Sequence, residues 1–364
     1  TILTVDELKE KLLPKYQAAI DADVQTIMAS YNSWNGVKCH GSKELLTDIL
    51  KIEMGFDGFV ISDWQGIDEI PGDYKSDIIT SITAWIDMVL VSVQGQRYKK
   101  FMRLLKESVE EGSIPLARID DAVKRILKVK IRNGLFDNPL VENDALKVIG
   151  SDAHRDIARQ AVRESVVVLK NDDIIPISKD SKSIVVAGRG ADNLGMLCGG
   201  WTINWQGGHG DITIGTTILD GIKKSVSAET NVIYSEDGQD LNDVDGELAV
   251  VVIGENPYTE FFGDKDNLDL LNDDINTINN LKNKGYKVMV LLISGRPMNI
   301  AEHIDDWDGF AAIWLPGSEG DGVSDILFGD FQSTGKLSYP WPIKAEHGAN
   351  ADDKDLLFNF GYGL

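Results

Sequence analysis

The chain has 364 residues, of which 43% are hydrophobic, and its formal net charge is -22. This length is enough for two domains of ordinary size, and no apolar run reaches the ~18 residues that a membrane-spanning helix needs. The acidic balance argues against nucleic acid and anionic membranes as partners and fits a neutral substrate, although the charge could equally serve solubility alone.

Helical and strand patterns alternate from residue 1 to residue 135. Apolar runs predict strands at 24–30, 58–62 and 87–91. Helical patterns precede and follow these runs, near 5–20, 43–54, 76–86, 97–111 and 117–132. We interpret this region as three strands of a parallel α/β arrangement.

The stretch 136–158 mixes Gly, Pro and polar residues and is predicted to be a linker. A helix near 154–170 then leads into a second alternating region, assigned to a domain at 159–342. Its predicted strands lie at 183–188, 231–235, 248–254, 287–294 and 310–316. Continuous apolar strands separated by helices indicate a parallel sheet covered on both faces. Residues 343–364 are predicted to be an irregular C-terminal tail.

Parallel α/β sheets gather their functional residues at the carboxyl ends of strands. Here those ends are rich in aromatic residues and carboxylates: Tyr31, Trp34, Asp63, Trp64, Trp201, Trp205, Glu255, Tyr258, Glu260 and Asp264. Aromatic rings can stack on the apolar faces of sugars, and carboxylates can bind their hydroxyl groups. This composition therefore suits a carbohydrate ligand.

Hydrolysis of a glycosidic bond needs two carboxyl groups, one ionised and one protonated. Asp63 and Glu260 are candidates for this pair. Each has an alternative interpretation: Asp63 could cap a helix, and Glu260 could be a solvated loop residue. The tryptophans at strand ends could equally be packing residues.

Other kinds of site have weaker support. The Gly-rich stretch 188–195 follows a strand, but its glycine spacing departs from the dinucleotide-binding pattern, and no helix pattern follows it. The five histidines show no metal-ligand spacing, and no GxSxG motif of a serine hydrolase occurs. The two cysteines, Cys39 and Cys198, form no framework. We therefore expect no cofactor and no metal.

Several segments resemble glycoside hydrolase family 3, the β-glucosidases and exo-β-glucanases. GFDGFVISDWQGID at 55–68 resembles the family's nucleophile segment, and TIMASYNSWNGVK at 26–38 resembles the strand before it. IGENPYTEFFGD, SGRPMNI, WLPGSEGDGVSDILFGDF and the terminal FGYGL resemble later family segments in the same order. The resemblance implies a (β/α)8-type barrel followed by an α/β sandwich domain.

The resemblance also implies roles for particular residues. Asp63 would be the catalytic nucleophile and Glu260 the general acid/base, with Glu255 as its rival in the same loop. The mechanism would retain the anomeric configuration and release terminal β-D-glucosyl residues from β-glucosides or β-glucans. The substrate-binding residues would be Trp64 and Trp205, clamping the leaving-group sugar, with Tyr31 and Met28 near the nucleophile and Trp201 at the pocket rim.

The sequence departs from the family at its start. Residues 1–135 match only the C-terminal part of the barrel, its last three strands, and the Lys-His pair of the earlier strands is not found. Trp85 stands where the family usually has a small residue. We therefore expect a further N-terminal segment or a second copy as partner, and no activity from the isolated chain.

The resemblance favours a secreted or periplasmic parent protein. A non-catalytic carbohydrate-binding or structural fragment is the alternative.

Overall fold

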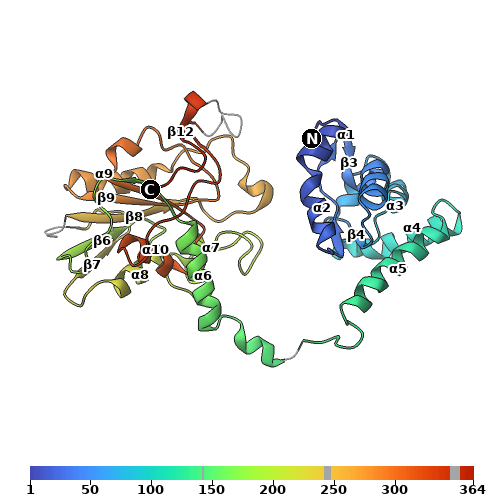
Figure 1. Cartoon of the computed structure of the whole chain (residues 1–364), viewed down its shortest axis with the longest axis horizontal. Coiled ribbons are helices and arrows are strands. Elements are labelled where there is room, and N and C mark those ends of the chain that lie inside the picture. Colours follow the sequence, from blue (N-terminus) through green and yellow to red (C-terminus); the bar gives the residue numbers. More distant parts are fainter. Residues whose placement is uncertain (142, 242–246, 345–352) are drawn as a thin grey trace. The chain divides into compact units, whose positions relative to one another are not determined.

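The computed structural model describes residues 1–141, 143–241, 247–344 and 353–364. The chain divides into two compact units, unit 1 at Thr1–Asn143 and unit 2 at Asp144–Leu364 (Figure 1). Each unit is described by itself below. The boundaries expected from the sequence, at 135 and 158, stay predictions. No helix among the described residues is both long and apolar enough to cross a membrane.

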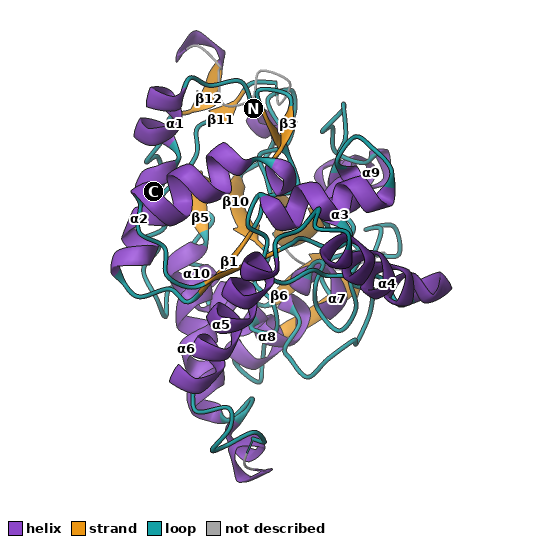
Figure 2. Cartoon of the chain, turned by 90° about the vertical axis from the view of Figure 1, so that its right-hand side faces the viewer, coloured by secondary structure: helices purple, strands orange, loops and turns teal. Residues whose placement is uncertain are grey.

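Unit 1 is an α/β unit in which helices outweigh strands (Figure 2). Its helices are α1 Val5–Lys11, α2 Leu13–Asp21, η1 Cys39–Gly41, η2 Glu44–Glu53, η3 Gly66–Glu69, α3 Tyr74–Thr83, η4 Gln94–Gln96, α4 Arg97–Glu110 and α5 Leu116–Arg132. Its strands are β1 Thr26–Met28, β2 Ser33–Trp34, β3 Val37–Lys38 and β4 Phe59–Ile61. β1 and β4 pair in parallel, with Met28 opposite Ile61, so the residues after both strands lie at one end of the pair.

The helix predicted near 5–20 is two helices. α1 starts at a capping box, in which Thr4 Oγ1 accepts a hydrogen bond from the Glu7 amide and Glu7 Oε2 accepts one from the Thr4 amide. α2 begins at Leu13 with a proline in its first turn. Proline is tolerated in a first turn because the N–H groups there have no partner within the helix. Inside one continuous helix its missing N–H would break the hydrogen-bond pattern.

The strand predicted at 87–91 is wrong as a full strand, since only a bridge between Ile61 and Met88 forms. The reason is a side chain. The Val60 amide donates to Asp87 Oδ2 at 2.8 Å, where a regular ladder would use a backbone carbonyl. The segment nevertheless runs beside β4, because the amides of Ser62 and Gln65 donate to the Met88 and Leu90 carbonyls.

Asp87 is the centre of a buried ion cluster. Its carboxylate binds Lys51 Nζ at 2.6 Å and also Arg118, and the Asp87 side chain has no exposed surface. Burial lowers the pKa of Lys51 to about 8, although Asp87 opposes this. Lys51 Nζ and Arg118 Cζ each lie 5.4 Å from the centroid of the Trp85 ring, and Trp85 Nε1 donates to Asp121. The large side chain at this position is therefore accommodated inside the cluster.

Asp87→Asn is expected to destabilise unit 1 by about 3–5 kcal/mol, because it leaves buried Lys51 without a counter-ion and Arg118 with the partly exposed Asp121 in place of a buried one. Asp121→Asn is the matched control. The Asp121 side chain is partly exposed, so its loss should cost much less. Urea unfolding of the full chain measures both effects, and equal losses would contradict the central role of Asp87.

Unit 2 contains a six-stranded sheet in the order β5-β10-β9-β8-β6-β7. Its strands are β5 Val167–Asn171, β6 Ser183–Ala187, β7 Asn231–Ser235, β8 Leu248–Gly254, β9 Lys287–Ile293 and β10 Gly309–Trp314. β6 to β10 are parallel, which confirms the predicted parallel α/β sheet, while β5 is an antiparallel edge strand. The helix predicted at 154–170 therefore ends too late: α6 is Asp152–Ser165, and the β-branched run that follows it enters the sheet.

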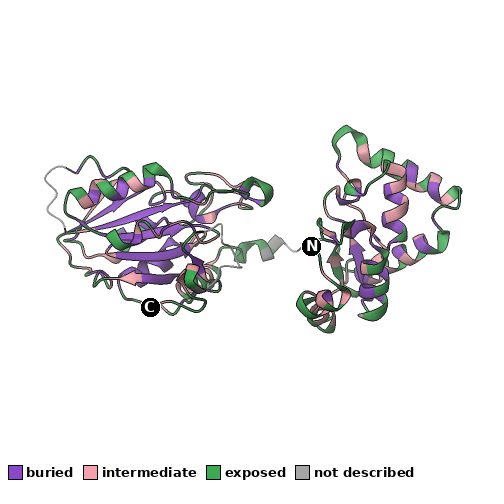
Figure 3. Ribbon diagram, turned by 90° about the horizontal axis from the view of Figure 1, so that it is seen from above, coloured by how far each residue is buried: buried purple, intermediate pink, exposed green. Residues whose placement is uncertain are grey.

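Helices cover both faces of this sheet (Figure 1). The helices are η5 Asn143–Val148, α6, α7 Leu194–Cys198, α8 Ile218–Ser225, η6 Glu260–Gly263, α9 Asn272–Asn283, η7 Ile304–Asp306, α10 Gly320–Leu327 and η9 Asp353–Asp355. α6, α8 and α10 pack on one face and α9 on the other, so the strands lie in a buried layer (Figure 3).

The tail is less irregular than predicted. Strand β11 at Trp341–Pro342 pairs with β12 at Leu356–Phe358, and the Leu364 amide donates to the Val168 carbonyl of β5. Part of the predicted tail, 345–352, lies outside the described residues.

Candidate active site

Asp63 lies just beyond the end of β4, as the sequence predicts, and is half-buried. Its Oδ1 accepts the Trp64 amide at 2.6 Å, and its carbonyl accepts the Gly66 amide at 3.1 Å. The turn into η3 is therefore made by the backbone around Asp63.

His40 fixes this backbone from a distant part of the sequence. Its ring is fully buried, and Nε2 accepts the Asp63 amide at 2.9 Å. The accepting Nε2 must be unprotonated, so the ring is neutral with its hydrogen on Nδ1. The ring fits against Gly66, where a Cβ would overlap the imidazole. No pattern in the sequence indicates this contact.

Acid is expected to loosen the backbone around Asp63. Burial lowers the pKa of His40, with Lys38 acting in the same direction and the charge of Asp63 opposing. The unfolded chain therefore binds a proton at a higher pH than the folded chain does. The stabilising contact of neutral His40 is present at neutral pH. Its contribution to stability is lost as the pH falls below the histidine pKa in the unfolded chain, about 6.5.

Hydrogen exchange of peptides covering 58–66 in the full chain measures this loss, after correction for the intrinsic pH dependence of exchange. In His40→Gln an amide oxygen can still accept the Asp63 amide, but the residue cannot titrate, so the acid-induced change should disappear. His154→Gln replaces an exposed histidine and serves as control. An unchanged pH response in His40→Gln would contradict the assignment.

Tyr31, Met28 and Trp64 are all exposed in unit 1. Tyr31 contacts the His40 ring edge-on, with centroids 6.3 Å apart. Its pKa is raised by burial first, then by Glu69, and also by the charge of Asp63. Met28 ends β1, the strand paired with β4. Unit 1 thus brings Tyr31 to the vicinity of Asp63 and leaves the indole of Trp64 open.

Glu260 begins η6 on the loop after β8, and its side chain is exposed. Its φ of 50° is in the left-handed region that non-glycine residues rarely adopt. The preceding residue, Thr259, is tied to the loop of Trp205. Gln206 Nε2 donates to Thr259 Oγ1 at 2.6 Å, Thr259 N donates to Gln206 Oε1 at 3.2 Å, and Thr259 Oγ1 donates to the Trp205 carbonyl at 3.0 Å. We call these three bonds the cross-loop clamp.

Glu255, the rival acid, has a different environment. It is buried, and its carboxylate accepts Arg296 Nη2 at 2.7 Å, Ser294 Oγ at 3.0 Å and the Tyr258 hydroxyl at 3.1 Å. Burial acts to raise its pKa, but the hydrogen bond and charge of Arg296, together with the hydrogen bonds from Ser294 and Tyr258, lower it, and the net pKa is lowered. A carboxyl group held ionised in this way is poorly suited to donate a proton.

The structure therefore places the candidates in two groups. Asp63, Trp64, Tyr31 and Met28 belong to unit 1, whereas Glu260, Trp201 and Trp205 belong to unit 2. The sequence analysis missed His40, Gln206 and Arg296, which act on the candidates through contacts between distant segments. No group of three or more potential metal-ligating side chains occurs among the described residues.

Comparison with known proteins places both units. The sequence model described as Glycosyl hydrolase family 3 C-terminal domain matches residues 166–364, and that of the Glycosyl hydrolase family 3 N terminal domain matches residues 2–129. The chain belongs to glycosyl hydrolase family 3.

Two curated proteins are among the relatives of the chain. The chain is 31% identical to a lysosomal beta glucosidase of Dictyostelium discoideum over 98% of its own length and 48% of that protein's. It is 28% identical to a periplasmic beta-glucosidase of Salmonella typhimurium, over 93% of the chain and 49% of that protein. The chain thus spans about half the length of the curated relatives it matches.

Two crystal structures agree with the fold. An exo-1,3/1,4-beta-glucanase from a Pseudoalteromonas species matches with a TM-score of 0.91 at 37% identity, over 100% of this chain and 48% of that one. A beta-glucosidase from Listeria innocua in complex with glucose matches with a TM-score of 0.85 at 26% identity, over 100% of this chain and 54% of that one.

Proposed function

We propose that the chain takes part in the hydrolysis of terminal non-reducing β-D-glucosyl residues from β-glucosides or β-glucans. The observation that carries this proposal is the contrast within the loop after β8. Glu255 is held ionised by Arg296, whereas Glu260 is exposed and positioned by the cross-loop clamp. Membership of glycosyl hydrolase family 3 supports the reaction class.

The proposed mechanism is a double displacement. The Asp63 carboxylate attacks the anomeric carbon while the glycosidic C–O bond breaks and Glu260 gives its proton to the leaving oxygen. Glu260 then takes a proton from water, whose oxygen attacks the same carbon and displaces Asp63, so the configuration is retained. Such chemistry requires carboxyl groups about 5–5.5 Å apart. The assembly of the two units must therefore supply this separation.

The proposed substrate is a β-linked gluco-oligosaccharide or β-glucoside. Trp64 and Trp205, both exposed, would hold the sugar on the leaving-group side, and Trp201 would shape the rim. Tyr31 and Met28 would lie near the sugar attacked by Asp63. The relatives support this substrate class, since one structure of the Listeria innocua beta-glucosidase holds glucose and a mutant of it holds laminaribiose.

We further propose that unit 1 pairs with a partner segment. Within the described residues, β4 is the one strand that pairs with β1, so the other edge of β1 presents unpaired backbone groups. A cavity of about 140 Å³ opens beside β1, and apolar side chains such as Leu8, Leu12 and Ile27 line it. A preceding N-terminal segment or a second copy of the chain would satisfy both features.

The test is hydrolysis of 4-nitrophenyl β-D-glucopyranoside by this chain alone and by the longest protein that its gene encodes. We expect turnover from the longer protein, with the β-anomer of glucose appearing first by NMR, and none from the isolated chain. Hydrolysis by neither protein would favour the alternative of a non-catalytic carbohydrate-binding fragment. Ordinary activity from the monomeric 364-residue chain would contradict the need for a partner segment.

A further inference from the structure

Four aromatic side chains form one exposed patch on unit 2, which we call the aromatic cluster. The exposed fractions are 69% for Trp201, 41% for Trp205, 64% for Phe261 and 56% for Phe262. The ring centroid of Trp205 lies 6.4 Å from that of Trp201, 6.0 Å from that of Phe261 and 5.6 Å from that of Phe262. Phe261 and Phe262 are 4.6 Å apart. The two phenylalanines have no role in the proposed function so far.

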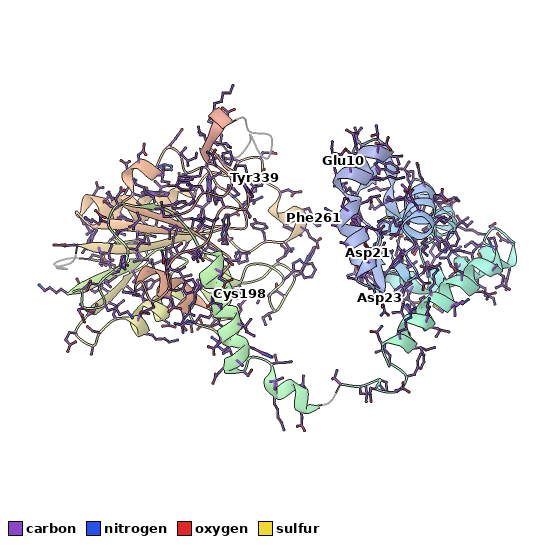
Figure 4. All side chains as sticks on the ribbon, in the orientation of Figure 1. Glu10, Asp21, Asp23, Cys198, Phe261 and Tyr339 are labelled. Carbon is purple, nitrogen blue, oxygen red and sulfur yellow. The ribbon has the colours of Figure 1, made fainter. Side chains whose placement is uncertain are left out.

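The cross-loop clamp joins the two loops that carry the patch. The loops also approach closely at glycines: a Cβ on Gly200 would overlap Tyr258 and Thr259, and a Cβ on Gly207 would overlap Pro257. Phe261 extends from its loop away from the sheet (Figure 4). Large apolar rings are thus held in fixed positions without being buried, an arrangement that folding alone does not require.

The backbone of both loops is strained at the patch. Trp201, Ile203 and Glu260 have φ values of 59°, 66° and 50°. The left-handed region is unfavourable for side chains with a Cβ, and most of all for a β-branched residue such as Ile203. Strain of this kind persists where the surrounding structure enforces it and is concentrated at functional sites. Here it flanks the rings and the proposed acid/base.

We propose that Phe261 and Phe262, together with Trp205, bind a second glucosyl unit of the leaving group, beyond the unit next to the scissile bond. The inference rests on the proposed function, because it requires Glu260 to face the leaving oxygen. Phe261 and Phe262 directly follow Glu260 in the chain, and their rings adjoin Trp205, which is the proposed holder of the leaving-group sugar, so they extend its apolar surface. Sugar rings stack on such surfaces through their apolar faces. The chain would therefore prefer gluco-oligosaccharides of three or more units over disaccharides.

Binding of sulfur-linked β-gluco-oligosaccharides, which the enzyme cannot cleave, tests the proposal. Titration calorimetry is performed on the longest protein that the gene encodes, with ligands of two and three glucosyl units. We expect the third unit to raise the affinity about tenfold, the order expected for stacking on an aromatic ring. In the double variant Phe261→Ala/Phe262→Ala this gain should vanish, while the affinity for the two-unit ligand stays within about twofold. Phe360→Ala removes an even more exposed phenylalanine of the tail and should change neither affinity.

Three results would overturn the proposal. The first is no length dependence in the unaltered protein, which includes the absence of any binding. The second is an equal loss for both ligands in the double variant, since this is what a packing role would cause. The third is an equal gain from the alkyl chain of octyl β-D-thioglucoside, which would indicate a general apolar surface such as a protein-docking patch. Length-dependent binding without hydrolysis would instead contradict the proposed function and leave the sugar-binding surface standing.

Discussion

Asp63→Ala is expected to lower kcat for an aryl β-glucoside by about 10⁴-fold or more, in the range seen when enzymes lose a central catalytic residue. Folding should survive, because the bond from the Asp63 amide to His40 belongs to the backbone and stays in place. The side chain itself contributes one local bond, to the Trp64 amide. Steady-state kinetics on the active protein, with circular dichroism to check the fold, measures both expectations.

A covalent label gives the independent check on Asp63. A 2-deoxy-2-fluoroglucoside with an activated leaving group slows hydrolysis of the glycosyl-enzyme more than its formation. The glycosyl-enzyme should therefore accumulate on the peptide that contains 58–66. Asp57→Asn is the control: Asp57 is an exposed partner of Lys128 two residues before the same strand, so the variant should keep full activity. A label on any other carboxylate would remove Asp63 from the mechanism.

Glu260→Ala is expected to lower the rate of the first step by about 10²–10⁴-fold for substrates with poor leaving groups. The rate for activated aryl glucosides should fall much less, because their leaving groups do not need a proton. Azide should restore turnover of the activated substrate by attacking the glycosyl-enzyme without base catalysis. Glu260→Gly is the second variant. Glycine adopts the φ of 50° without strain, so a loss of activity shared by the alanine and glycine variants cannot come from backbone strain at this position.

Glu255→Gln should behave differently from either Glu260 variant. It leaves Arg296 and the hydroxyls of Ser294 and Tyr258 without their ionised acceptor. We therefore expect lower stability of unit 2 and no rescue by azide. If azide rescues a Glu255 variant instead, the assignment of the acid/base within this loop is wrong.

Most of the fold of unit 2 could be predicted from the sequence because its strands are continuous apolar runs, buried on both faces. Strand β5 was not predicted, because its valines directly follow an amphipathic helix without a glycine or proline between them. In unit 1 the segment after Trp85 has the composition of a strand. A single buried carboxylate, Asp87, takes over the hydrogen bond that would have continued the ladder.

The candidate site divides in the same way. Asp63 and Glu260 stand in local motifs that can be read directly, at the ends of apolar runs. The residues that orient them cannot be read, since they act from far along the chain. His40 reaches Asp63 across 23 positions, and Gln206 reaches Thr259 across 53. A histidine or glutamine in a polar loop has no sequence pattern that announces such a contact.

The cross-loop clamp has a consequence for engineering within the family. Segments 199–208 and 255–263 share hydrogen bonds and glycine-sized contact points, so neither has a conformation independent of the other. A chimera that imports one segment from a relative would pair a foreign loop with an unsuited neighbour and misdirect the carboxyl group of Glu260. Transferring the two segments together keeps Glu260 and the adjoining aromatic rings in their mutual positions. An altered substrate preference should therefore be transferred by both segments together and not by either one alone.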